Sequence, residues 1–198
     1  MKDRSDHHDV LRLVPLRPED YDCVQALLNT PRLCKRRLYS GIHELHPTEW
    51  TRVRKTFVIW EQDRLLGTTE LHADEDEPGH WELNVTVDHV EEKQYAARCA
   101  IAGLFYAFEV LGARSVWFWN ERDNGRMHRF AEKTGFTRLN ELMVPGGGVA
   151  DVFELDGRCW ETETVNRFAD YLNRPIEICD SSGAWRGEGA AFFVLTED

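Results

Sequence analysis

Positive charge is in short supply in this sequence. It has 24 lysine and arginine residues against 35 aspartate and glutamate residues, which gives a formal net charge of -11 at pH 7. Nucleic acids and anionic membranes both attract cationic surfaces, so a protein with this acidic balance is a poor candidate for general binding to either. We therefore expect neither nucleic acid nor a membrane as a partner.

Long hydrophobic runs are also missing. The longest stretch without charge, residues 99–108, is far shorter than the roughly 20 apolar residues that a membrane-spanning helix needs. Residues 1–9, MKDRSDHHD, lack the apolar region of a signal peptide and are expected to form a disordered polar tail. These features are typical of a cytoplasmic protein.

Cysteine is scarce and scattered. The five cysteines are odd in number and include no C-x-x-C pair, so they indicate neither a disulfide framework nor a zinc site: Cys23, Cys34, Cys99, Cys159 and Cys179. We expect most of them to be buried thiols. The motif HELH at residues 43–46 offers two histidines but no third ligand, so no metal site is predicted.

The sequence does contain alternating strand-like and helix-like segments. Residues 10–16 alternate like a strand, and residues 17–29 begin with a proline and two acids, as helices often do. Three further strands joined by turns are predicted at residues 57–61, 65–73 and 81–87. The charge run at residues 74–77 is interpreted as a solvated hairpin loop.

The clearest helix follows these strands. Its apolar residues have the i, i+3, i+4, i+7 spacing of a helix that buries one stripe: Ala97, Ala100, Ile101, Leu104, Phe105, Phe108 and Leu111. Gly112 can adopt the left-handed conformation that ends a helix, and the β-branched and aromatic residues 115–120 predict a strand. The order strand, helix, strand indicates an α/β unit.

Shorter segments complete the chain. Asn124 can cap a helix that ends at Gly135, and residues 137–144 and 149–157 are predicted to pair as antiparallel strands. The remaining segments are helix-like at residues 162–173 and strand-like at residues 176–179 and 190–195. We expect one principal domain at residues 10–160, and an extension at residues 161–198 that packs on the same domain or on a partner chain.

This order of elements resembles the GNAT superfamily of N-acetyltransferases over about residues 10–160. The segments NGRMHRFAEKTGF and YAFEVLGARSVWFWN are similar to the branch that acetylates protein N-termini and small amines. The resemblance implies a mixed α/β (α+β) fold, with a mostly antiparallel central sheet, about four flanking helices and here a short C-terminal extension. It also implies acetyl-CoA as the co-substrate.

In that family the pantetheine arm of acetyl-CoA lies between the fourth and fifth strands, here beside the backbone of Val85 and Val87. The pyrophosphate lies on the N-terminus of the following helix, where free N–H groups and the helix dipole favour anions. The resemblance places this contact at Lys93, Gln94, Tyr95, Ala96, Ala97 and Arg98. The usual loop glycines are missing, because there is no glycine between Gly79 and Gly103.

Without those glycines, Lys93 and Arg98 are the residues that can meet phosphate by charge. The other interpretation is that they are ordinary solvated residues of a first helical turn. Asn120 and Asn124 resemble family positions that contact the pantetheine or the adenylate. Their alternative roles are a turn at a strand end and a helix cap.

Acetyl transfer needs a base that removes a proton from the acceptor amine, and Glu82 is the first candidate, with Glu70 as the alternate. Glu82 can also be a plain exposed strand carboxylate. A backbone N–H near Asn84 or Val85 can stabilise the thioester oxygen. Where the family often has a tyrosine acid this sequence has Ala131, so His128 is the substitute candidate, unless it is a solvated histidine.

The leading hypothesis is an acyl-CoA-dependent N-acyltransferase that moves acetyl to an amine of a small molecule or a protein N-terminus. One alternative is a non-catalytic binding module that has lost the coenzyme. Another is a diverged enzyme acting on a nucleotide, for which the only support is two basic clusters at residues 34–37 and 52–55. These clusters can equally be a locally basic surface. A homodimer is a further expectation, through the strand-like residues 190–195.

Overall fold

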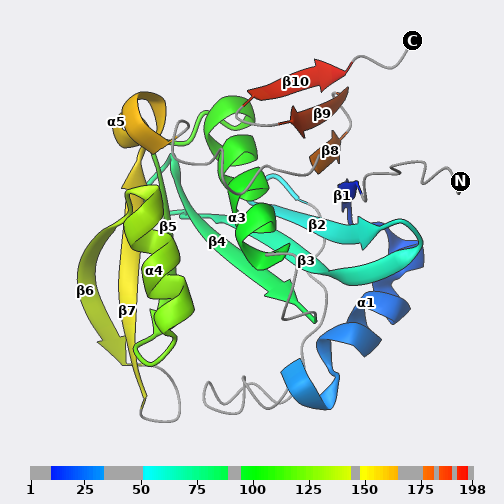
Figure 1. Ribbon diagram of the computed structural model, residues 1–198, viewed down its shortest axis with the longest axis horizontal. Helices are drawn as coiled ribbons and strands as arrows, with labels where there is room; N and C mark the ends of the chain where they lie inside the picture. Colours follow the sequence, from blue (N-terminus) through cyan, green and yellow to red (C-terminus); the bar gives the residue numbers. More distant parts are fainter. Residues whose placement is uncertain are drawn as a thin grey trace, which may run out of the picture.

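The computed structural model describes residues 10–33, 51–88, 95–143, 148–164, 176–180, 183–188 and 191–195. Within these ranges, ten strands form one sheet in the order β10-β9-β8-β1-β2-β3-β4-β5-β7-β6 (Figure 1). The pairs β1–β8 and β4–β5 are parallel, and the other described pairs are antiparallel. The predicted mixed, mostly antiparallel sheet is therefore confirmed.

The first half of the chain follows the predicted order. Strand β1 spans Leu11–Pro15, a 3-10 turn spans Pro18–Asp20, and helix α1 spans Tyr21–Leu28. The three central strands are β2 (Arg54–Glu61), β3 (Arg64–Ala73) and β4 (His80–Val87). Strand β2 begins earlier than expected because Arg54 and Lys55 pair with His72 and Leu71 of β3. The second basic cluster is thus partly on a strand.

The second half contains the predicted α/β unit. Helix α3 spans Tyr95–Phe105, continues as a π turn at Tyr106–Val110, and precedes Gly112 with its positive φ of 64°. Strand β5 spans Ser115–Glu121 and helix α4 spans Gly125–Thr134. Strands β6 (Thr137–Met143) and β7 (Val149–Asp156) form the expected antiparallel pair.

The C-terminal segment extends the sheet beyond β1. A short helix α5 (Gly157–Cys159) runs into a π turn at Trp160–Thr164, and the rest of the helix expected at residues 162–173 lies outside the described residues. Strand β8 (Ile176–Asp180) pairs with β1, and β9 (Gly183–Glu188) joins it to β10 (Ala191–Leu195). Strand β9 was not predicted, because GAWRGE has no alternating strand pattern. It forms a strand because it pairs with β8 on one side and with β10 on the other.

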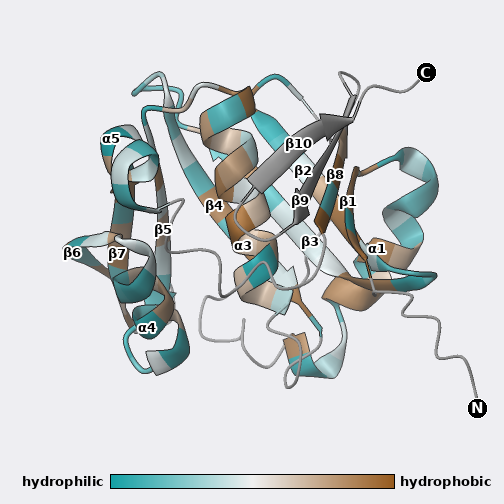
Figure 2. Ribbon diagram, turned by 45° about the horizontal axis from the view of Figure 1, so that its top comes forward, coloured by the Kyte–Doolittle hydropathy of each residue, from teal (hydrophilic) through white to brown (hydrophobic). Residues whose placement is uncertain are grey.

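Helices α1 and α3 cover opposite faces of the sheet. Phe57 and Ile59 of β2 belong to the large core beneath α3, whereas Val58 between them packs with Val24 and Leu28 of α1. Alternate residues of a strand point to opposite faces, so these contacts define an α3 face and an α1 face. Figure 2 shows hydrophobic residues along α3 and along strands β1 and β8.

The cysteines correct one expectation. Of the four that the structure describes, Cys99 alone is fully buried, Cys23 is exposed, and Cys159 and Cys179 are partly buried. Cys23 is exposed because α1 turns Val24 and Leu28, not Cys23, toward the sheet. The pKa of Cys99 is raised to about 12, because the effect of burial outweighs the opposite effect of the nearby Arg98 charge. The described residues include no helix long and apolar enough to cross a membrane.

Candidate active site

Strands β4 and β5 pair only where they begin. Their parallel register joins His80 to Ser115, Trp81 to Val116 and Glu82 to Trp117, and no further pair of these strands is recorded among the described residues. Beyond this point β4 continues to Val87 and β5 to Glu121. Residues 83–87 of β4 and 118–121 of β5 are thus not paired with each other, and we call this region the β4–β5 split.

On their other edges both strands keep their hydrogen-bonded partners. The two strands therefore separate only along the edges that face each other. Strand β4 stays paired with β3 to its last residue, where Val87 lies opposite Gly67, and β5 stays paired with β7 as far as Glu121 opposite Ala150. A Cβ on Gly67 of β3 would lie 1.8 Å from the carbonyl oxygen of Thr86 on β4. The glycine therefore permits β3 to approach β4 closely at this point. The split therefore presents two strand edges to an extended ligand.

The start of α3 buries two of the predicted contact residues. Tyr95 is buried and its hydroxyl donates a 2.6 Å hydrogen bond to Oε2 of Glu61 at the end of β2. Arg98 is only 1% exposed. Both residues lie on the helix face that also buries Cys99, because positions i, i+3 and i+4 share one face. Both side chains are therefore shielded from solvent, and the predicted contact of this helix start with the pyrophosphate stays a prediction.

The other predicted contacts at this helix start have different positions. Ala96 is exposed and Ala97 is partly buried, whereas Lys93 and Gln94 lie outside the described residues. A cation that the sequence did not reveal lies nearby: Arg32 Nη1 is 3.7 Å from Oδ1 of Asp88 and donates to the carbonyl oxygen of Asp88 at 3.3 Å. Asp88 directly follows β4, so Arg32 brings a guanidinium to the end of the split.

Glu82 lies at the last paired position before the strands separate. Its neighbours Trp81 and Leu83 are in the core beneath α3, so Glu82 points to the α1 face. There Oε2 of Glu82 lies 4.0 Å from Nδ1 of His72 on β3, and Nε2 of His72 in turn lies 3.3 Å from Oε2 of Glu70. The structure therefore joins the two candidate bases, Glu82 and Glu70, through His72.

A second polar network lies at the closed end of the split. The Ser115 hydroxyl donates to Oε1 of Glu154 at 2.6 Å and lies 2.9 Å from Nδ1 of His80. The same His80 nitrogen is 3.7 Å from carboxylate oxygens of both Glu154 and Glu77. The single hydroxyl proton of Ser115 goes to a carboxylate, so His80 does not activate this serine as a nucleophile.

The beginning of α4 brings two predicted residues together. Asn124 is the N-cap: its Oδ1 accepts from the backbone N–H of Met127 at 3.4 Å, and its Nδ2 donates to Oδ1 of Asn120 at 3.1 Å. Gly135, with φ of 85°, ends the helix as predicted. Asn120 and Asn124 thus fulfil the structural roles considered for them, a strand-end contact and a helix cap, which leaves their proposed coenzyme contact untested.

His128 lies on the other side of β5 from β4. Its ring meets Phe153 of β7 edge-on at 5.1 Å, and its Nε2 is 3.6 Å from Oδ2 of Asp151. Phe153 belongs to the core on the α3 face, whereas Glu82 is on the α1 face. The structure therefore does not bring the two predicted catalytic residues, Glu82 and His128, into one contact.

Asp151 forms a charged cluster that sequence reasoning missed. It is only 2% exposed, and its carboxylate accepts from Nη2 of Arg138 at 2.5 Å and from Nη2 of Arg122 at 3.3 Å. Burial raises the pKa of Asp151, but the hydrogen bonds and charges of the two arginines outweigh this and leave the pKa below its ordinary value. Both arginines also pair with Glu141.

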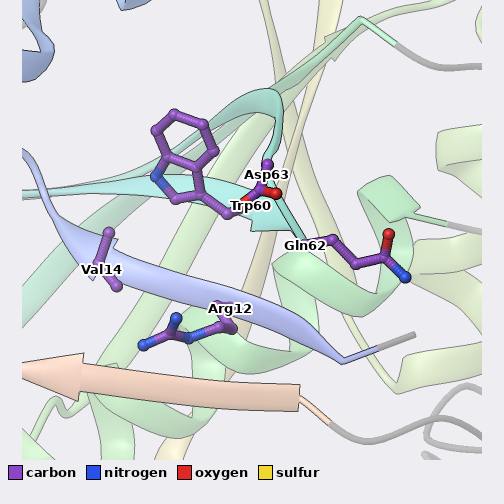
Figure 3. A pocket seen from close by; sticks show the side chains of 5 residues that line it. All are labelled: Arg12, Val14, Trp60, Gln62 and Asp63. Carbon is purple, nitrogen blue, oxygen red and sulfur yellow. The ribbon is translucent and has the colours of Figure 1, made fainter. Parts of the chain in front are cut away.

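A shallow hollow of about 290 Å³ lies apart from these groups (Figure 3). It is lined by residues of β1, the end of β2 and the turn that follows β2: Arg12, Val14, Trp60, Gln62 and Asp63. None of them was predicted as a site residue. Among the described residues, no group of histidine, cysteine and acidic side chains could hold a metal ion, and the HELH motif lies outside them.

Comparisons with known proteins agree with this architecture. The family model described as an acetyltransferase (GNAT) domain matches residues 11–137. No curated protein matches the chain. Among solved structures, a GCN5-related N-acetyltransferase from Brucella melitensis is similar with a TM-score of 0.62, 18% identity and 81% of each chain covered.

Two structures of spermidine N-acetyltransferase from Vibrio cholerae are also similar. A dodecameric form has a TM-score of 0.61, 14% identity and coverage of 78% of this chain and 98% of its own. A complex with CoA and spermine has a TM-score of 0.58, 16% identity and coverage of 77% and 98%. At these identities the similarity shows a shared fold.

Proposed function

Because the chain belongs to the acetyltransferase (GNAT) family, we propose that it moves acetyl from acetyl-CoA to an amine of a small molecule or a protein N-terminus by direct attack. The observation that carries this proposal is the β4–β5 split. Pairing of the two strands ends at Glu82 and Trp117, so a carboxylate lies where the facing strand edges become free.

Acetyl-CoA supplies an activated thioester when it binds. The fit of this chain to it is good at the split, where the main chain of β4 beside Val85 and Val87 can hydrogen-bond to the amides of an extended arm. A backbone N–H near Asn84 or Val85 stabilises the carbonyl oxygen of the thioester. Glu82 takes the proton of the attacking amine, directly or through water.

At the pyrophosphate end the fit depends on other residues. The side chains of Tyr95 and Arg98 are buried, so the main-chain N–H groups at the start of α3, together with Arg32 and Lys93, are the groups proposed to meet the phosphates. The general acid that protonates the leaving thiolate is a separate question. His128 stays a prediction for that role, because its described partners, Asp151 and Phe153, both belong to β7.

The acceptor proposed here is a small cationic amine. Glu70 and Glu82 place two carboxylates on the α1 face beside the split, and carboxylates attract an ammonium group. Two of the similar solved structures are spermidine N-acetyltransferases, one of them with spermine bound. Those substrates belong to those proteins, and we propose the same chemical class for this chain.

A non-catalytic binding module is the second candidate. Two observations favour it: Ala131, which is fully buried, occupies the position of the family tyrosine, and the sequence has no glycine between Gly79 and Gly103, where the family has its loop glycines. A module of this kind would retain the fold but would not bind the coenzyme.

Thermal unfolding with and without acetyl-CoA separates these candidates. A ligand at about 100 times its dissociation constant stabilises the folded state by about 2.7 kcal/mol, so an enzyme should melt at a clearly higher temperature in millimolar acetyl-CoA. Desulfo-CoA, which lacks the thiol and cannot carry an acyl group, is the control ligand and should give a similar shift. An unchanged melting temperature with both ligands would reject the acetyltransferase proposal.

Replacing the proposed base tests the chemistry itself. Glu82→Gln should lower kcat by about 100-fold or more, the usual contribution of a general base, and should leave the coenzyme-induced thermal shift unchanged. Glu77→Gln is the matched control, because Glu77 is an exposed carboxylate that contacts His80 outside the split. Full turnover of the Glu82→Gln variant would rule out this residue as the base.

We also propose that two copies associate through β10. This strand is at one end of the sheet, and its sequence, AFFVL, has no charge that would oppose pairing with a second strand. Light scattering after size exclusion should then give twice the chain mass of 23.0 kDa. A mass of 23.0 kDa at protein concentrations of tens of micromolar would contradict it.

A further inference from the structure

Three ionisable side chains of neighbouring strands meet on the α1 face. His72 and Glu82 are directly opposite each other in the β3–β4 register, and Glu70 precedes His72 by two residues, so all three point the same way. Their side chains are between 16% and 27% exposed, so they are partly shielded from water but still within reach of a small ligand. Thr68 fixes the far side of Glu70 with a hydrogen bond of 3.1 Å.

The contact with Glu70 decides which nitrogen of neutral His72 carries the proton. An ionised carboxylate can only accept hydrogen bonds, so Nε2, at 3.3 Å from Glu70, must be the N–H donor. In the neutral imidazole Nδ1 then has a free lone pair, and Nδ1 is the nitrogen that faces Glu82 at 4.0 Å. Such contacts often shorten when substrate binds.

We propose that His72, oriented by Glu70, is a positioning residue that takes from Glu82 the proton removed from the acceptor amine. This inference rests on the proposed function. In the step, the O–H bond of protonated Glu82 breaks and an N–H bond forms at Nδ1 of His72. Glu82 becomes a carboxylate again, and the positive charge of the imidazolium is balanced by Glu70.

The surroundings of His72 suit this role. On β2, Arg54 is opposite His72 in the register and is exposed to solvent, while Thr56, opposite Glu70, is uncharged. On the side of β5, Glu82 is paired with Trp117, which has no charge. Among the described residues, the two carboxylates are therefore the ionised groups recorded within 4.0 Å of the imidazole.

His80 provides a matched comparison. It is on the same strand and the same face as Glu82, but its Nδ1 is occupied by Ser115 at 2.9 Å and by the carboxylates of Glu154 and Glu77. It has no recorded contact with Glu82 among the described residues. A substitution at His80 therefore perturbs a network of one histidine and two carboxylates, as a substitution at His72 does. It does not affect the proposed proton transfer from Glu82 to His72.

The kinetic test uses His72→Gln with His80→Gln as its control. The glutamine amide can still donate to Glu70, as Nε2 does, but it cannot take a proton. His72→Gln should lower kcat by about tenfold or more with KM for acetyl-CoA within about twofold of the wild type. In a Glu82→Gln background it should cause no further loss, because residues that act in series are not additive.

Added imidazole provides a rescue. It should restore part of the turnover of His72→Ala and none of that of Glu82→Gln, which a purely structural role for His72 would not produce. Wild-type kcat in His72→Gln, or equal losses from His72→Gln in the wild-type and Glu82→Gln backgrounds, would overturn the inference while leaving the acetyltransferase proposal intact.

A readout independent of turnover separates the two proposals. In nitrogen NMR of the imidazole rings, Glu82→Gln should shift the Nδ1 resonance of His72, and Glu70→Leu, which removes the acceptor that faces Nε2, should lower the population of the Nε2–H tautomer. Absence of both changes refutes the inference even if the protein is an active enzyme. If the changes occur and the wild type has no turnover with any amine, the proposed function fails and the catalytic use of His72 fails with it.

Discussion

At the scale of single residues, Asp151 shows how a buried charge is tolerated. Its carboxylate is almost fully buried, yet two guanidinium groups, each about half exposed, pair with it. The arginines come from different segments, Arg122 from the turn directly after β5 and Arg138 from β6. Because the cost of burying one ion is offset only by such partners, Asp151 links these strands to β7 electrostatically.

Asp151→Asn should therefore destabilise the protein in a pH-dependent way. The pKa of Asp151 is lowered in the folded state, so its stabilisation is fully present above the ordinary value of 3.8 and is lost as the pH falls through the lower folded value. Near pH 7 the loss should be about 2 kcal/mol, typical of hydrogen bonds to a charged group. Urea unfolding at pH 7 and at successively lower pH measures the loss and its decline in acid.

Glu141→Gln is the control for that measurement. Glu141 pairs with the same two arginines but is about half exposed, so its removal should cost no more than about 1 kcal/mol. Equal and pH-independent effects of the two variants would show that the buried position of Asp151 has no special electrostatic role.

At the scale of elements, helix α4 depends on its cap. Asn124 accepts from the N–H of Met127 and also holds Asn120, so it fixes the helix start to the end of β5. This cap and the terminal Gly135 were both readable in the sequence, because each satisfies a local backbone requirement. The direction of His128 within the same helix was not readable, since it depends on the packing of α4 against β7.

Asn124→Ala should lower the free energy of unfolding by about 1 kcal/mol, the usual loss when a helix loses its N-cap. Asn124→Asp should recover most of that loss, because aspartate caps equally well. Chemical denaturation of the two variants checks this. If Asn124→Asp is as unstable as Asn124→Ala, the contact with Asn120, not the cap, is the main contribution.

The C-terminal strands are a second element whose role depends on packing. Ile176 and Ile178 of β8 are fully buried in the core beneath α3, and Glu177 pairs with Arg12 of β1. Strand β8 thus covers the edge that β1 would otherwise expose. The sequence predicted strand character here but left open whether the extension packs on its own domain or on a partner.

Ile178→Ala should destabilise the protein by roughly 2–5 kcal/mol, and Ile178→Val by about 0.5–1.5 kcal/mol, as expected for a fully buried side chain. Differential scanning calorimetry of both variants tests this ordering. The experimental error in comparing two variants is about 0.5 kcal/mol. A loss smaller than this for Ile178→Ala would mean that β8 is only loosely attached to the core.

At the scale of the whole molecule, acidity is the property with the broadest consequence. The net charge of -11 should repel the phosphate backbone, and of the two basic clusters the structure describes the one at positions 52–55, which has three basic residues. The nucleotide-modifying alternative therefore lacks a described cationic surface of the size that DNA binding requires.

We expect no binding of duplex DNA at physiological salt. Non-specific DNA-binding proteins have dissociation constants of about 10⁻⁴–10⁻⁶ M there, so fluorescence anisotropy should stay flat with protein up to about 10⁻⁴ M. Saturable binding that weakens steeply as salt is raised would contradict this expectation and would favour a nucleic-acid substrate.

The sequence by itself determined most of the elements and their order. Apolar spacing predicted α3, alternation predicted the central strands, and single residues such as Gly112 and Asn124 marked helix ends, because these signals act within a few residues. These features depend on local conformation, which neighbouring residues control. The choice of Glu82 as base came from the family resemblance and stays a prediction.

Tertiary structure alone decided how distant segments meet. It ended the β4–β5 pairing at Glu82, placed His72 between Glu82 and Glu70, and brought Arg32 to Asp88 across 56 positions of sequence. It also buried the side chains of Tyr95 and Arg98. Such contacts depend on strand register and on which helix face is covered, and neither is encoded within one stretch of chain.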